Sequence, residues 1–377
     1  ALARAGVARG TAVPAGGAID VDERGEPTGI LKENANALVD AVVPPSSADE
    51  SFEAARRGQA EAWRRGITGI FDLDASAGAI PLGAFQRLRE RGELGLRVVM
   101  GLPHRRLDEA IALGLRTGFG DEWLRIGQLK IFSDGALGSQ TAALEEPYEG
   151  SDDRGILTIE PALLAADVAR AATAGIAVAI HAIGDRAVRV ALDAIAPTRR
   201  TAPGLRQRLE HVQLARVEDV ARFASLGVIA SMQPIHATSD RDLADRHWGP
   251  RRAALAYPWR ALADAGVRLA FGSDAPVEPI DPLLGIHAAV ARKRPGDADR
   301  WHPEQALTLD EALAAYSSGA AYATGREREA GTLGVGMHCD ATVIDRDLAA
   351  LPADEWLGAS VRAAIVDGAV RWEQGLA

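Results

Sequence analysis

The sequence predicts an α/β fold: a TIM-like (β/α)8 barrel of parallel strands without its first strand, followed by a small C-terminal β appendage. Short β-rich apolar runs alternate with helical stretches rich in Ala, Leu and Arg from about residue 67 onward. Most of these runs carry polar residues near their carboxyl ends, and the residues after 330 change to short strands joined by turns. Alternation of this kind is typical of parallel strands joined by crossover helices.

Seven apolar runs are candidates for the parallel strands. They cover residues 67–74, 96–103, 124–134, 176–185, 205–214, 227–237 and 267–276. The segments between them predict amphipathic helices, and two of these segments, 162–175 and 217–227, end in glycine, which commonly stops a helix. Seven strand–helix units fit an eight-stranded barrel that is one unit short, or an open doubly wound sheet.

The positions of the polar residues favour the barrel. A barrel builds its active site at the C-terminal face from several strands, whereas an open sheet gathers it at one switch point. Six of the seven runs have polar ends: Asp72 and Asp74, Lys130 and Asp134, His181 and Asp185, Glu210 and His211, Gln233 and His236, and Asp274. The sequence contains no GxGxxG after a strand and no GxxxxGK[ST], so it has no nucleotide-phosphate motif.

Two domains are expected. Residues 1–330 form the barrel, and residues 331–377 form the C-terminal part of a small β-sandwich-like domain. The Gly- and Pro-rich segment 14–31 predicts a hairpin before the first helix, and Asp367-Gly368 predicts a tight hairpin turn near the end of the chain.

Composition limits the classes of partner. The net charge of −10 argues against a general nucleic-acid surface. No apolar run reaches the ~18 residues needed to cross a bilayer, so no membrane partner is expected. Cys339 is the single cysteine, which excludes an intrachain disulfide; we expect it in the core and the protein in the cytoplasm. The expected partner is a small-molecule substrate.

Four residues are candidates for chemistry: Lys130, His181, His211 and Asp274, each near the end of a different predicted strand. A buried ammonium is costly to desolvate, and imidazole and carboxylate groups are the usual ligands of zinc and related ions. Taken singly, each has an ordinary structural explanation, such as a hydrogen-bonded core histidine or a helix N-cap. Their joint occurrence on strands in this order favours a metal site.

Several longer motifs agree with this interpretation. They are LKIFSDGALGSQTAAL, AIHAIGDRAV, RLEHVQL, ASMQPIHA, WGPRRAALAYPWRAL and LAFGSDAPVEPIDPL. With these motifs the chain resembles the amidohydrolase superfamily over nearly its whole length. Within that superfamily it resembles the branch of AepA-like and N-substituted formamide deformylase-like proteins.

The resemblance implies a metal-dependent hydrolase barrel and a role for each candidate. Lys130 matches a fourth-strand lysine that is often carboxylated and bridges two metal ions. His181 and His211 match histidines that hold one metal. Asp274 matches an aspartate that binds metal or the attacking water and passes the proton of that water to the leaving nitrogen. The implied cofactor is one or two divalent ions, with zinc expected. The implied reaction is hydrolysis of a non-peptide C–N bond, such as an amide or formamide, by metal-activated water.

One motif of that superfamily, His-x-His at the end of the first strand, is absent from the eight histidines of the chain. The chain is therefore expected to be a fragment, beginning at the second barrel strand, with an impaired metal site. A homo-oligomer is expected because unpaired sheet edges invite pairing with another copy. Two alternatives stay open: a non-catalytic regulatory or binding protein on the same barrel, and a deaminase or cyclic-amide hydrolase of the same superfamily.

Weaker candidates for substrate contact surround the four residues. Asp134 and Gln140 lie in the loop after Lys130, Gln233 and His236 at the expected end of the seventh strand, and Arg252 in the WGPRRAALAY motif. A purely structural role is an equal alternative for each of them.

Overall fold

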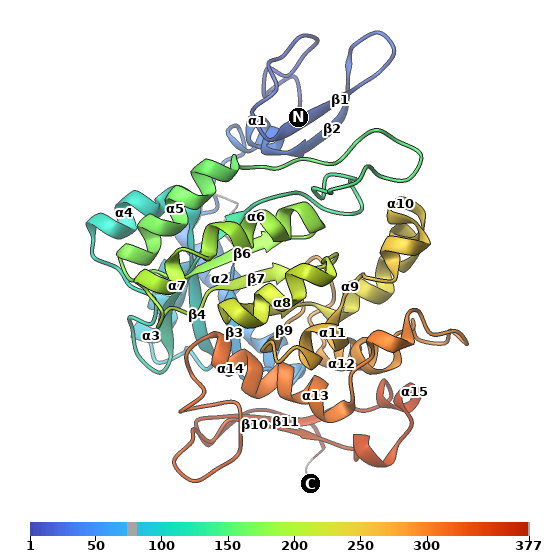
Figure 1. The fold of residues 1–377 in the computed structure, drawn as a ribbon. Coiled ribbons are helices and arrows are strands. Elements are labelled where there is room, and N and C mark those ends of the chain that lie inside the picture. Colours follow the sequence, from blue (N-terminus) through green and yellow to red (C-terminus); the bar gives the residue numbers. More distant parts are fainter. Residues whose placement is uncertain (74–80, 376–377) are drawn as a thin grey trace.

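The fold is seen in a computed structural model that describes residues 1–73 and 81–375 (Figure 1). Seven parallel strands form one curled sheet in sequence order, with β3 and β9 at the two ends of the order. They are β3 (Gly69–Asp72), β4 (Arg97–Pro103), β5 (Leu124–Phe132), β6 (Val178–Ala182), β7 (Arg208–His211), β8 (Ile229–Met232) and β9 (Leu269–Phe271). The predicted barrel-type sheet of seven strands is therefore confirmed. Asp74, one of the predicted polar strand ends, lies outside the described residues.

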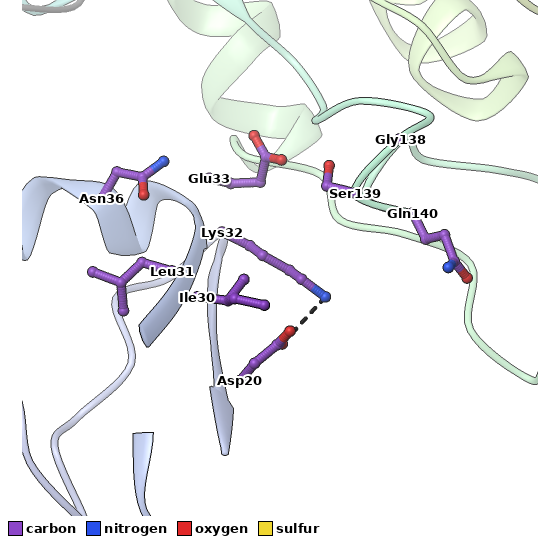
Figure 2. A pocket seen from close by; sticks show the side chains of 9 residues that line it. All are labelled: Asp20, Ile30, Leu31, Lys32, Glu33, Asn36, Gly138, Ser139 and Gln140. Carbon is purple, nitrogen blue, oxygen red and sulfur yellow. Dashed lines mark ion pairs between the residues drawn. The ribbon is translucent and has the colours of Figure 1, made fainter. Parts of the chain in front are cut away.

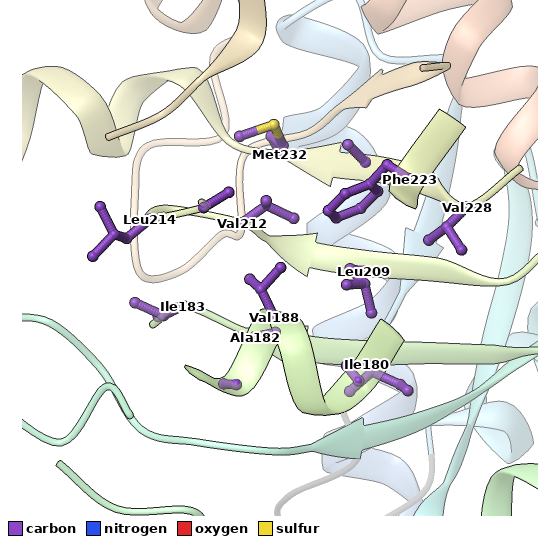
Figure 3. Packing of buried hydrophobic residues seen from close by; sticks show 14 of the residues in the cluster. Ile180, Ala182, Ile183, Val188, Leu209, Val212, Leu214, Phe223, Val228 and Met232 are labelled. Carbon is purple, nitrogen blue, oxygen red and sulfur yellow. The ribbon is translucent and has the colours of Figure 1, made fainter. Parts of the chain in front are cut away.

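Helices follow the strands as a parallel sheet requires. They include α3 (Leu82–Glu90), α4 (Leu107–Ala112), α5 (Pro161–Thr173), α6 (Asp185–Ile195), α7 (Thr198–Thr201), α8 (Val217–Leu226), α11 (Trp259–Asp264), α12 (Pro282–Ala291), α13 (Leu309–Ala314) and α14 (Ala320–Ala323). Gly227 ends α8 in the left-handed conformation, as its position in the sequence predicted. Val188 of α6 and Phe223 of α8 are buried in the same cluster as Leu209 of β7, so these helices share one core with the sheet (Figure 3).

One predicted strand is shorter than expected, and a helical excursion follows it. The run 227–237 leaves the sheet after Met232, and α9 (Pro234–Ser239) begins at once, followed by α10 (Arg241–Ala253). Pro234 has no backbone N–H to give to a strand ladder and fits the first turn of a helix. His236 therefore lies on a helix, where the sequence predicted the end of a strand.

Elements at the two chain ends flank the sheet (Figure 1). The predicted N-terminal hairpin is confirmed as β1 (Gly17–Val21) and β2 (Pro27–Glu33), followed by α1 (Ala37–Asp40) and α2 (Ala48–Arg64). The C-terminal sheet consists of β10 (Ala341–Ile344), β11 (Val361–Val366) and β12 (Ala369–Glu373), with α15 (Ala353–Trp356) between the first two strands. Asp367 and Gly368 turn β11 into β12 with φ of 56° and 74°, which confirms the predicted hairpin turn.

The composition led to expectations about Cys339 and about membrane-spanning segments. Cys339 is exposed, so the expectation that it fills the core is wrong; it follows an irregular loop just before β10. No helix in the described part of the chain combines the length and the apolar character needed to cross a membrane.

A buried ion pair fastens the C-terminal sheet to the barrel. The Arg97 side chain on β4 is 2% exposed; its Nε lies 2.5 Å from Oδ2 of Asp340, and its second terminal nitrogen lies 2.9 Å from Oδ1. The same guanidinium also reaches Asp367, at 3.2 Å. Because Asp340 directly precedes β10 and Asp367 lies in the turn between β11 and β12, this arginine joins the two parts of the fold.

Replacing Asp340 with alanine is expected to lower the free energy of unfolding by about 3–5 kcal/mol, since it leaves a buried guanidinium without its bidentate partner. Urea denaturation measures the change. Glu53→Ala, which removes an exposed carboxylate from α2, is the matched control and should have a much smaller effect. Equal losses in the two variants would contradict the anchoring role.

Candidate metal centre

The sheet brings the four predicted residues to its carboxyl ends. Lys130 lies on β5, His181 on β6, and His211 at the end of β7, while Asp274 follows β9. The ring centroids of His181 and His211 are 4.5 Å apart. Nζ of Lys130 lies 4.6 Å from the centroid of the Phe132 ring, which is itself 5.2 Å from the His181 ring.

The hydrogen bonds of the two histidines show which ring nitrogen is left for a ligand. Nε2 of His181 lies 3.0 Å from the carbonyl oxygen of Gly135, which can only accept, so Nε2 carries the proton. Nδ1 of His211 lies 2.8 Å from Oε1 of Gln233 and is likewise the donor. Among the described residues, Nδ1 of His181 and Nε2 of His211 have no hydrogen-bond partner. Histidines that bind metal usually donate their other ring N–H to a carbonyl or carboxylate in this way.

Both imidazoles are neutral at physiological pH. Burial is the main cause that lowers the pKa of His181 to about 3, and the charge of Lys130 adds to it. Burial also holds the pKa of His211 well below its ordinary value, with help from His181 and Lys130. A metal ion binds only the neutral imidazole, so these two residues are already in the form that can ligate.

Lys130 is a buried lysine without a direct carboxylate partner among the described residues. The residue is only 4% exposed. Burial lowers the pKa of its ammonium, while the charges of Glu210 and Asp274 oppose the change. Nearby, Glu210 is bound to Arg208, at 2.6 Å, so its charge is largely shared with that arginine.

His236 lies closer to the candidate metal ligands than the sequence predicted. It was expected only as a substrate contact, yet ligand atoms of His211, His236 and Asp274 lie within 4.8 Å of one another. Nε2 of His236 is 3.4 Å from Oδ2 of Asp274, and Nδ1 is 3.4 Å from Oε1 of Glu278. Glu278, four residues after Asp274, was not identified from the sequence at all.

His236 is in its charged imidazolium form at neutral pH when no metal is bound. Burial opposes the charge, but hydrogen bonds with Asp274 and Glu278 outweigh burial and raise the pKa of His236 to about 9. An imidazolium has no lone pair to give, so a metal ion and this proton exclude each other at His236. A metal ion bound at His236 would therefore have to displace this proton.

Metal binding that uses His236 should therefore release about one proton per ion below pH 9. The apparent affinity should rise about tenfold per pH unit up to that point and level off above it. Calorimetric titration with Zn²⁺, in buffers of different ionisation enthalpy, measures the number of protons released. His236→Gln should remove the slope. A wild-type affinity independent of pH from 6 to 9 would show that His236 is not a ligand.

The weaker candidates occupy different positions. Gln233 orients His211, as described above. Asp134 is 1% exposed, and its two oxygens accept backbone N–H groups from Ile183 (3.0 Å), Gly184 (2.8 Å) and Ala143 (2.9 Å). Burial raises the pKa of Asp134 to about 8 against these hydrogen bonds.

The other two weaker candidates lie farther out. Arg252 is buried and donates from Nε to the carbonyl oxygen of Trp248 (2.6 Å) and from a terminal nitrogen to that of Glu146 (3.0 Å), which fixes α10 against the loop after β5. Gln140 is exposed and adopts a φ of 56°. The substrate-contact roles of these residues stay predictions.

An open cavity of about 460 Å³ separates the N-terminal hairpin from the loop after β5. Figure 2 shows Lys32 extending to Asp20, at 3.2 Å, on the hairpin side. The facing wall is formed by Gly138, Ser139 and Gln140. The cavity is polar. It lies at the same end of the sheet as the histidines, because this facing wall belongs to the loop that follows β5, the strand that carries Lys130.

Comparisons with known proteins agree with this geometry. YtcJ of Bacillus subtilis (strain 168), named as an amidohydrolase, is 32% identical over 99% of this chain and 71% of its own length. The N-substituted formamide deformylase of Arthrobacter pascens is 30% identical over 99% of this chain and 70% of its own length. A metal-dependent hydrolase from Pyrococcus furiosus, known by its crystal structure, superimposes with a TM-score of 0.70 at 30% identity.

That superposition covers 84% of this chain but 64% of the Pyrococcus furiosus chain, so the present chain spans less than two thirds of the solved relative. The family comparison covers more of the sequence, since residues 1–371 match the amidohydrolase family. With the curled parallel sheet and the histidine-rich mouth already described, the chain belongs to the amidohydrolase family.

Proposed function

We propose that this protein is a metal-dependent hydrolase that cleaves a non-peptide C–N bond of an amide or formamide. The observation that carries the proposal is the pair of neutral histidines, His181 and His211, whose remaining ring nitrogens have no partner among the described residues. The name of the Arthrobacter pascens relative supports the formamide class of substrate.

The residues present fit a divalent ion. Two neutral imidazoles and the carboxylate of Asp274 are ligands that zinc takes in proteins, and zinc is the ion we propose. Lys130 is proposed as a further ligand in its carboxylated form, because a lysine with a lowered pKa presents the neutral amine that reacts with carbon dioxide. When bound, a divalent ion polarises a carbonyl group and lowers the pKa of water.

The protein's own groups then have distinct tasks. Asp274 is 37% exposed, so it can take up a proton at the mouth of the barrel and return it to the leaving nitrogen. His236 holds Asp274 from one side and Glu278 holds His236 from the other. Gln233 and Gly135 fix the two histidine rings, which keeps the ligand geometry in place before substrate arrives.

The test is a substrate panel of N-substituted formamides and N-acyl amines with the zinc-loaded chain, read as release of formate or free amine. We expect cleavage that falls to the enzyme-free background in His211→Ala. One observation favours a second candidate, a non-catalytic binding protein: the eight histidines include no His-x-His pair. Stoichiometric zinc binding without cleavage of any C–N bond would favour that candidate.

A further inference from the structure

We propose that Glu33, the last residue of the N-terminal hairpin, is a positioning residue of the metal centre. It holds the loop after β5 so that the carbonyl group of Gly135 fixes the ring of His181. The proposal depends on the proposed function only in taking His181 as a metal ligand. It makes the hairpin, distant in sequence from every predicted ligand, part of what aligns the centre.

A short chain of hydrogen bonds carries the argument. Oγ1 of Thr141 donates to Oε1 of Glu33 at 2.5 Å and accepts from the backbone N–H of Ala136 at 3.0 Å. The carbonyl oxygen of Thr141 accepts from the N–H of Gly135 at 3.2 Å. The carbonyl oxygen of Gly135 in turn accepts from Nε2 of His181 at 3.0 Å. The hairpin is thus connected to the imidazole through one turn of loop.

The carboxylate also packs directly against the loop backbone. A Cβ atom built on Gly135 would lie 2.2 Å from Oε1 of Glu33 and 2.1 Å from Oγ1 of Thr141. Any side chain at 135 would displace both groups, so this close approach favours glycine at that position. The close approach places the Glu33 carboxylate beside Gly135, the residue whose carbonyl group orients His181.

Glu33 holds this position against backbone strain. Its φ of 51° and ψ of −127° are unfavourable for a residue with a side chain. Asn34 secures the next peptide, because its Nδ2 donates to the carbonyl oxygens of Ala15 (2.9 Å) and Thr158 (3.0 Å). Strain that the surroundings maintain in this way is typical of sites where geometry serves function.

The loop that Glu33 holds presents a second oxygen atom to the histidine. Oδ1 of Asp134, one residue before Gly135, lies 3.4 Å from Nε2 of His181. Two oxygen atoms on the Nε2 side of the ring favour the tautomer that leaves Nδ1 for a metal. Glu33 stands on the wall of the 460 Å³ cavity, facing Ser139 (Figure 2).

The experiment uses the metal-free chain labelled with ¹⁵N-histidine. NMR follows solvent exchange of the His181 Nε2 proton, assigned by its loss in His181→Gln. We expect Glu33→Gln and Thr141→Val to speed this exchange about tenfold. Thr141→Ser keeps the hydroxyl group and should exchange at the wild-type rate. Glu23→Gln, the same change at an exposed position of the hairpin, is the matched control and should leave the exchange unchanged.

Cobalt titration of the same variants gives the second readout. Affinity should fall about tenfold in Glu33→Gln and Thr141→Val but not in Thr141→Ser or Glu23→Gln. Exchange in Glu33→Gln equal to that in Glu23→Gln would overturn the proposal. So would a uniform change in all histidine signals, together with a lowered unfolding temperature, since that indicates a merely structural role. A wild-type chain that binds no cobalt would contradict the proposed function, while the exchange rates still decide the role of Glu33.

Discussion

Replacement of His211 by alanine should weaken divalent-metal binding by more than about 100-fold. His211 belongs both to the His181–His211 pair and to the cluster of His211, His236 and Asp274. Its ring is 4.5 Å from that of His181, and its ligand atom lies within 4.8 Å of those of His236 and Asp274. Losing it removes a buried, neutral nitrogen that is already oriented by Gln233.

Competition with a chromophoric chelator measures this loss for Zn²⁺ and Co²⁺. His302→Ala is the matched control, because that histidine lies outside the cluster beside Glu304 and should leave the affinity unchanged. Gln233→Leu should give an intermediate loss of about 10- to 100-fold, since it leaves the ligand but removes the acceptor for its Nδ1 proton. If His211→Ala bound zinc as tightly as the wild type, the ion would have to sit elsewhere.

A large effect on stability is also expected at Asp134. Replacement by alanine should lower the free energy of unfolding by about 3 kcal/mol or more, because three buried backbone N–H groups lose their acceptor. Asp134→Asn should also destabilise the fold, since its NH₂ group would face one of these donors. Chemical denaturation measures both changes.

The control for Asp134 is Asp152→Ala in the exposed part of the loop after β5, which should change the stability by no more than about 0.5 kcal/mol. If Asp134→Ala lowered the free energy of unfolding as little as Asp152→Ala, the loop would not depend on the Asp134 carboxylate for its stability. A normal stability combined with lost zinc binding would instead move Asp134 from a structural role to a direct one.

Periodicity and composition predicted the sheet well, because strand–helix alternation is a local property. The apolar runs that contain Lys130 and His181 became adjacent strands, and Phe132 pairs with His181 in the ladder. Gly227 marked the end of α8, and Asp367-Gly368 marked the turn between β11 and β12, because these residue types adopt positive φ readily. These features depend on residues near in sequence, so a single sequence is enough to find them.

The contacts that complete the site could not be predicted in the same way. Pro234 could have signalled the helix start that moves His236 off the strand, and Glu278 follows Asp274 by four residues, but neither spacing fixes where a side chain goes. Glu33 meets Thr141 across 108 positions of chain, and only the folded structure brings them together. Asp134 looked like a loop residue at the mouth, yet its oxygens are taken by backbone groups.

Anomalous diffraction at the zinc absorption edge, from crystals of this chain grown with zinc, tests the metal centre most directly. We predict a peak about 2.0–2.2 Å from Nε2 of His211, within reach of Nδ1 of His181 and the carboxylate of Asp274. His236 should either join the ligands or remain bound to Glu278, according to pH. A map with no peak among these residues at saturating zinc, or with its only peak elsewhere, would contradict a metal site at the mouth of this barrel.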